Sequence, residues 1–210
     1  MGDGCRKVRN TLMGTSVLVA AVLVLGETGA SASSGTVVKE PQYGFSFHLP
    51  ANWKQVPLDG SDVTALLNSA SHDDPTLANA LSSEVTSGAA KGMKVFAVGP
   101  LAGSTVPNVN VIVTSSAGAP TGRAFAQAAV AEAKIEFRQI GASHLKTSTV
   151  NNHLGFAAEA TYQLNLKSST EFGAQFYLRH GANVEIVTIT TSSHAATGSN
   201  AQFIMNRWRW

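Results

Sequence analysis

Residues 143–193 read SHLKTSTVNNHLGFAAEATYQLNLKSSTEFGAQFYLRHGANVEIVTITTSS, and the pattern of this stretch decides the fold. Apolar and polar side chains alternate with a period of two over residues 156–166 and again over residues 172–178, as in strands that bury one face. Residues 184–191 are apolar on both faces, which is typical of a well-covered strand. Gly181 can adopt the positive φ of a tight hairpin before this last strand. The stretch therefore predicts a meander of three or four antiparallel strands.

Patterns outside the meander predict the helices and the remaining strands. In residues 122–140 an apolar side chain recurs at every fourth position and forms one helical stripe, which contains Phe125, Ala129, Ala133 and Phe137. The other expected elements are a strand at 43–49, two helices within 61–88, strands at 93–98 and 108–113, and a last helix capped by Thr197 or Ser199. Because most strands follow one another without a crossover helix, the order predicts an α+β fold, an antiparallel sheet flanked by helices.

The first 32 residues have the pattern of a secretory signal peptide. Positive charges lie within residues 6–9, a short apolar run follows at 12–25, and Ala-Ser-Ala occupies residues 30–32. This order of charge, apolar run and small residues predicts cleavage between Ala32 and Ser33. The apolar run is shorter than the roughly 20 residues that a spanning helix needs. An uncleaved signal anchor is the alternative.

The composition limits the classes of partner and the kind of core. Charged residues make up 13% of the chain and the formal net charge is +2, with no basic run inside the domain, so no nucleic-acid partner is expected. Cys5 is the only cysteine and precedes the apolar run, so the mature chain has no disulfide and no thiol nucleophile. We divide the chain into a signal peptide at 1–32, a flexible lead-in at 33–42 and one domain at 43–210, which is long enough to form a core unaided.

Motifs that carry chemistry are missing from the sequence. It has no G-x-S-x-G, no G-x-G-x-x-G, no P-loop and no H-E-x-x-H. No two of its six histidines are three to five residues apart, so none forms a helical metal pair. The cluster at residues 72–74 favours helix capping over cation binding, and Glu159 and Glu171 favour solubility over an acid–base role. The sequence therefore predicts no catalytic residue, no cofactor and no metal site.

The last four residues, Arg207, Trp208, Arg209 and Trp210, form a possible partner contact. Trp and Arg are common at interfaces, so this tail could touch a membrane or an acidic partner. It is equally well the packed end of a helix, where cations suit the helix dipole. The sequence does not decide between the two interpretations.

The run FSFHLPANW at residues 45–53 resembles the opening of PsbP-like domains, in which an aromatic strand is followed by proline, two residues and tryptophan. The long helix from Gly122, the strands of residues 155–191 and the ending Ile204-x-x-Arg207-Trp208 also match this layout. The family includes the photosystem II extrinsic protein and secreted actinobacterial members of the LpqN type. The resemblance implies an α/β/α sandwich around an antiparallel sheet that serves as a binding or assembly module without a catalytic residue. It does not imply a photosynthetic role, because fold alone does not carry function.

The export signal and the resemblance together predict a secreted, non-catalytic binding module of the bacterial cell envelope. Its expected partner is an envelope or extracellular protein, or a small apolar ligand. One alternative is an exported hydrolase whose serine, histidine and acid come together only in the folded chain. Another is the same domain tethered to the membrane by an uncleaved signal.

Overall fold

The structure is a computed structural model of the whole chain, and it describes residues 35–56, 58, 92–100, 106–166 and 169–210. The signal peptide, its cleavage site at Ala32 and Ser33, and the two helices expected within 61–88 lie outside the described residues. Within these ranges, neither helix is long and apolar enough to cross a lipid bilayer.

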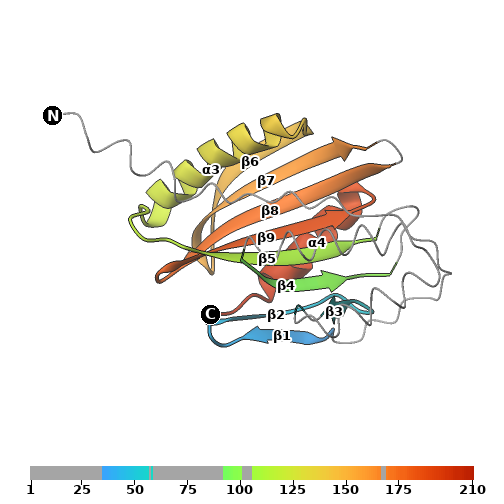
Figure 1. Cartoon of the computed structure of the whole chain (residues 1–210), viewed down its shortest axis with the longest axis horizontal. Coiled ribbons are helices and arrows are strands. Elements are labelled where there is room, and N and C mark those ends of the chain that lie inside the picture. The colour runs from blue at the N-terminus through green and yellow to red at the C-terminus, as the bar shows by residue number, and fades with distance from the viewer. Residues whose placement is uncertain (1–34, 57, 59–91, 101–105, 167–168) are drawn as a thin grey trace.

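An antiparallel sheet forms the centre of the molecule (Figure 1). Its strands are β3 (Lys54–Val56), β4 (Met93–Val98), β5 (Asn108–Ser115), β6 (Ser143–Asn152), β7 (Gly155–Asn165), β8 (Thr170–His180) and β9 (Asn183–Thr191). Their order across the sheet is β3-β4-β5-β9-β8-β7-β6, and each neighbouring pair is antiparallel. Strands β6 to β9 are the predicted meander, and Gly181 has the expected positive φ of 57° between the last two.

A two-stranded hairpin lies beside this sheet, and its first strand falls within the expected lead-in. It pairs β1 (Val37–Glu40) with β2 (Phe45–His48). The sequence predicts a lead-in at 33–42 that is flexible until Val37 or Val38, and β1 begins at Val37 within this segment. The physical reason is Val38, whose side chain is fully buried opposite Phe47, so this part of the chain contributes to the core. A four-residue strand with one buried side chain has too short a pattern to recognise.

Helices cover both faces of the sheet, which confirms the predicted α+β architecture. Helix α3 (Gly122–Gln139) packs on β6 and β7, and α4 (His194–Asn206) packs on β8, β9 and β2 (Figure 1). Each face has its own apolar core. The predicted stripe of α3, from Phe125 to Phe137, is buried in one core, and Ile204 of α4 belongs to the other.

The start of α4 differs from the prediction. Thr197 and Ser199 were the expected caps, but the N-cap is Ser193, whose hydroxyl accepts a hydrogen bond from the N–H of Ala196 at 3.2 Å. Thr197 lies in the first turn instead, where its hydroxyl donates to the carbonyl of Phe172. Serine and threonine are both good N-cap residues by type. The sequence alone therefore does not decide whether Ser193, Thr197 or Ser199 precedes the first helical residue.

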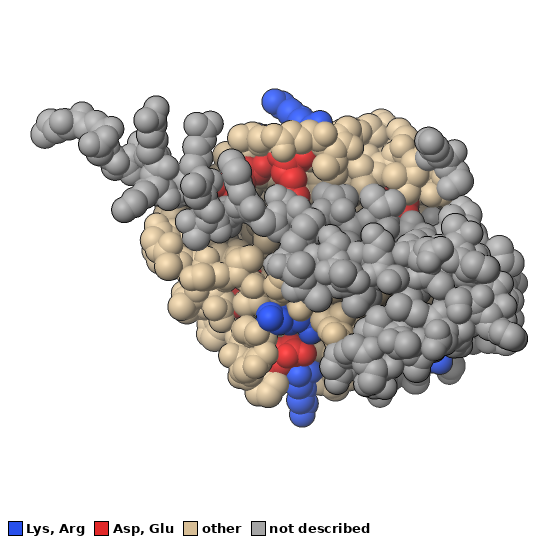
Figure 2. Space-filling view, in the orientation of Figure 1, with Lys and Arg blue, Asp and Glu red and all other residues tan. Residues whose placement is uncertain are grey.

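The outer surface carries few charges. Figure 2 shows that, on the face in view, side chains other than Lys, Arg, Asp and Glu cover most of the described surface. This agrees with a charged fraction of 13% for the whole chain.

Candidate binding site

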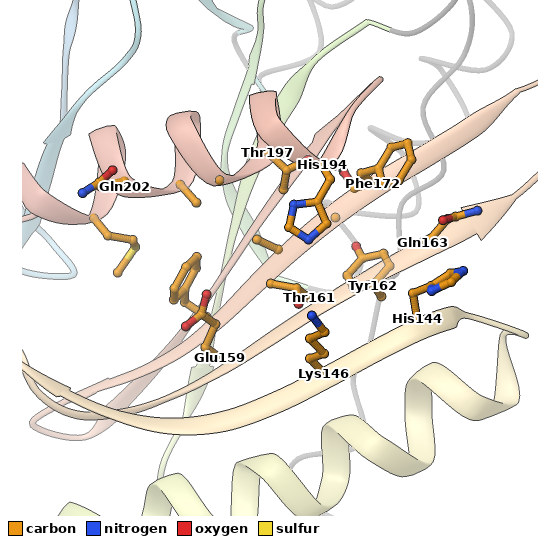
Figure 3. A pocket seen from close by; sticks show the side chains of 16 residues that line it. His144, Lys146, Glu159, Thr161, Tyr162, Gln163, Phe172, His194, Thr197 and Gln202 are labelled. Atoms are coloured by element: carbon orange, nitrogen blue, oxygen red, sulfur yellow. Dashed lines mark hydrogen bonds between the residues drawn. The ribbon is translucent and has the colours of Figure 1, made fainter.

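A groove lies between α4 and the face of β6, β7 and β8, with a volume of about 370 Å³ (Figure 3). It exists because α4 packs on β8 and β9, whereas α3 covers β6 and β7 from the opposite face of the sheet. The α4 side of β6 and β7, the first two strands of the meander, is therefore left open beside the helix. We refer to this space as the α4 groove.

Apolar side chains form the floor of the α4 groove. Ala174 and Phe176 come from β8, and Ala201 and Met205 come from α4. All four are buried. Successive side chains of a strand point to opposite faces, so the period-two pattern of β8 places its small and aromatic residues beneath the helix. Gly198, one turn before Ala201, leaves room along the helix side, because a Cβ at this position would meet no atom within 4 Å.

Polar side chains form the opposite wall and one end. Lys146 of β6 lies directly across from Thr161 of β7, and Figure 3 shows Lys146 and His194 facing one another across the groove. His144 lies at the same end, at an irregularity of β6 where its φ is +51°. Glu159 lies further along the groove and pairs in register with Phe176. The basic groups and the carboxyl therefore occupy different parts of the site.

The electrostatics of the α4 groove follow from this separation. Burial raises the pKa of the Glu159 carboxyl, and no neighbouring charge contributes to that shift. Within the described ranges, the ammonium of Lys146 makes no hydrogen bond or ion pair. Removing a carboxyl from water disfavours its ionised form, and a nearby cation would have acted in the opposite direction. The groove thus offers an apolar floor, an unpaired cation at one end and a partly desolvated carboxyl at the other.

The opposite face of the sheet holds a buried polar network under α3. Gln175 donates to the hydroxyl of Tyr177 at 2.7 Å, Tyr177 donates to the carboxylate of Glu136 at 3.2 Å, and Thr188 donates to Gln175 at 3.2 Å. Burial, followed by the nearby charge of Glu136, raises the pKa of Tyr177. Because Gln175 and Tyr177 are buried and bonded to each other, we assign this network to the core.

The predicted partner contact at the C-terminus has two different parts. Trp208 is fully buried and stacks on the rings of Phe45 and Phe47, at centroid distances of 4.8 Å and 5.0 Å. Its side chain is therefore inaccessible to a partner. Trp210 is 38% exposed and stacks on His180 at 4.5 Å.

The two arginines of the tail are exposed. Arg207 lies over the ring of Phe203, with 3.9 Å from its Cζ to the ring centroid. Arg209 exchanges backbone hydrogen bonds with Ser46 at 2.8 Å and 2.9 Å. These two side chains and Trp210 form the accessible part of the tail.

The described residues form neither the acid–base pair nor the Ser/His/acid site that the sequence analysis considered. Glu159 points to the α4 side of the sheet, whereas Glu171 belongs to the alternate face of β8, so the two carboxyls form no pair. In the part of the chain that the structure describes, no histidine hydrogen-bonds to a serine, a threonine or a carboxylate. The same residues contain no group of three or more His, Cys, Asp or Glu arranged to hold a metal. The cluster at residues 72–74 lies outside the described ranges.

Sequence reasoning missed the residues that matter most for the α4 groove, namely His144, Lys146 and His194. His144 and Lys146 are two residues apart, but His194 lies 48 residues after Lys146, and the three share no motif. The alternation of β6 indicates which side chains share a face with Lys146, but not that a helix borders that face.

Comparison with known proteins gives the fold a name. No family model matches the sequence, and no curated protein matches it. Among solved structures, the cyanobacterial PsbP protein CyanoP of Synechocystis is similar over 88% of this chain and 98% of its own, with a TM-score of 0.51 and 11% identity. The chain has a PsbP-like fold. This confirms the PsbP-like resemblance of the sequence.

Two other solved structures are similar to this chain at lower TM-scores. LpqN of Mycobacterium tuberculosis, described as involved in cell envelope biogenesis, covers 83% of each chain with 11% identity and a TM-score of 0.46. A protein of Bacteroides thetaiotaomicron is 10% identical over 84% of this chain, with a TM-score of 0.48. This chain spans only 48% of that protein's length. At such identities the likeness concerns the fold alone.

Proposed function

We propose that this protein is an exported, non-catalytic binding module of the bacterial cell envelope, and that it binds a small, largely apolar ligand in the α4 groove. The observation that carries the proposal is the groove itself, which has an apolar floor and a volume of about 370 Å³. Binding sites for small molecules typically have volumes of about 300–1,000 Å³ and mostly apolar linings with a few polar groups. The signal-like N-terminus supports export, and the PsbP-like fold is compatible with a binding role.

A protein partner is a second candidate, and a different surface favours it. Arg207, Arg209 and Trp210 are exposed next to the β1–β2 hairpin. Exposed Trp and Arg side chains are enriched at protein interfaces. This surface is separate from the lining of the α4 groove, so the two candidates can be tested independently.

Filling the groove tests the ligand proposal. Gly198→Leu places a side chain in open space at the α4 groove and replaces a weak helix former, so the variant should fold at least as well as the parent chain. The neutral apolar dye Nile red is the probe, measured by fluorescence titration. We expect Gly198→Leu to weaken dye binding at least about tenfold, which corresponds to about 1.4 kcal/mol.

The matched control is Ser199→Leu, which adds the same side chain at an exposed position of α4 that does not line the groove. This variant should bind the dye like the parent chain. Equal binding by the parent chain and Gly198→Leu would overturn the assignment of the α4 groove as the ligand site.

A further inference from the structure

The charged groups of the α4 groove are distributed unevenly along its length. Lys146, His144 and His194 lie toward one end, where β6 begins and α4 starts. Glu159 is nearer the other end, beside Phe176. The floor between these two ends is apolar, so a bound molecule would contact basic groups at one end and apolar side chains along the middle.

The position of Lys146 within β6 is fixed by pairing. It is opposite Thr161, and Thr161 is opposite Ala174 on the following strand. Glu159 is two residues from Thr161 on the same face of β7, a separation of about 7 Å along a strand. Even so, burial alone accounts for the raised pKa of Glu159, and Lys146 makes no contribution. In Figure 3 the side chain of Lys146 lies beside Thr161 and faces His194, whereas Glu159 is further along the groove, so the ammonium borders the open space where a ligand would lie.

We infer that the ligand of the α4 groove is an anionic amphiphile, whose carboxylate or phosphate group is held by Lys146 with His144 and His194, and whose apolar part lies on Phe176, Ala201 and Met205. This inference rests on the proposed function and names the ligand class for the same site. A hydrogen bond between an ammonium and an anionic oxygen is stronger than one between neutral groups. Lys146 therefore determines where the anionic head group binds. Glu159 disfavours a negative charge at the other end and sets the orientation of the ligand.

The first test compares two molecules that differ only in the head group. Decanoate and decanol have the same chain length, and each is titrated against bound Nile red at neutral pH and low salt. We expect decanoate to displace the dye from the parent chain at a concentration at least about tenfold lower than decanol. Decyl phosphate in parallel distinguishes the two anionic head groups, and tighter binding of either one supports the inference.

The second test removes the cation. Lys146→Gln should abolish the preference for decanoate over decanol and leave the affinity for decanol unchanged. Lys146→Arg should restore most of the preference. The matched control is Lys134→Gln, which removes an equal charge from an exposed position of α3 and should leave the preference intact.

The outcomes separate this inference from the function on which it depends. The assignment of an anionic head group is wrong if the parent chain binds decanoate and decanol equally, or if Lys146→Gln keeps the preference for decanoate. In either case the groove still binds an apolar ligand. If the parent chain binds neither molecule and Gly198→Leu does not alter Nile red binding, the proposed function fails and the inference fails with it.

Discussion

Glu185 is the residue whose burial has the clearest consequence for stability. It is fully buried on β9, between Val113 of β5 and Leu178 of β8 in the register of the sheet. Within the described ranges, no other residue donates a hydrogen bond to either carboxyl oxygen. Burial raises the pKa of this carboxyl to about 8, and its own backbone N–H offsets only part of the effect. An acid in such a place is held in its neutral form near neutral pH.

The sign of the resulting pH dependence follows from proton binding. In the unfolded chain the carboxyl of Glu185 ionises around 4.5, whereas in the folded chain it ionises near 8. Between these values the folded state keeps a proton that the unfolded state has lost, so rising pH favours unfolding. The contribution of Glu185 to stability is therefore fully present below about pH 4.5 and is lost as the pH rises to about 8.

Glu185→Gln should remove this dependence. The amide has the same shape as the carboxylic acid and does not ionise, so we expect equal stability near pH 4.5 and a variant more stable by at most about 5 kcal/mol above pH 8. Urea denaturation across this pH range measures the difference. Glu132→Gln on α3 is the control, because that carboxyl is only half-buried and burial raises its pKa less far, so its removal should change the pH dependence less. A constant difference between parent and variant at every pH would contradict the assignment.

At the scale of elements, the C-terminal segment fastens the β1–β2 hairpin to the rest of the molecule. Trp208 stacks on two rings of β2, and Arg209 pairs through its backbone with Ser46. The hairpin shares no backbone pairing with the main sheet in the described ranges. Packing between these rings and the apolar core therefore holds it in place.

Trp208→Ala should thus destabilise the protein by about 3–5 kcal/mol, the usual cost of removing a large buried aromatic side chain. Trp210→Ala is the matched control, because its ring is 38% exposed and stacks only at the surface. We expect a change of less than about 1 kcal/mol for this variant. Chemical denaturation of both variants gives the comparison. Similar losses in the two would show that Trp208 has no special role in the core.

The elements differ in how well the sequence predicts them, and the reason is physical. Strand β7 and helix α3 show several repeats of their period, so both were predicted. Strand β1 is too short for a period, and the cap of α4 depended on tertiary contacts of Thr197. The α4 groove could not be predicted, because its lining comes from α4 and from strands of the meander, and only the folded chain decides which face a helix leaves uncovered.

At the scale of the whole molecule, the two faces of the sheet have different properties. On the α3 side, Gln175 and Tyr177 form a bonded network that is buried within the core. On the α4 side, Lys146 and Glu159 border open space and are not paired with each other. A buried and satisfied network fixes one structure, whereas unpaired groups beside a groove remain available for binding. We therefore expect variants of the α3 face to affect stability, and those of the α4 groove to affect binding.

Export is the remaining prediction for the whole chain. Cleavage between Ala32 and Ser33 would leave β1, which begins at Val37, intact in the mature protein. When the full chain is expressed in a bacterial host with a general secretion system, intact-mass measurement should find a protein that starts at Ser33. Ala32→Arg should block cleavage, because signal peptidase requires a small residue there, and the uncleaved chain should remain with the membrane fraction. An unprocessed protein in the membrane fraction of the parent chain would instead support the tethered form.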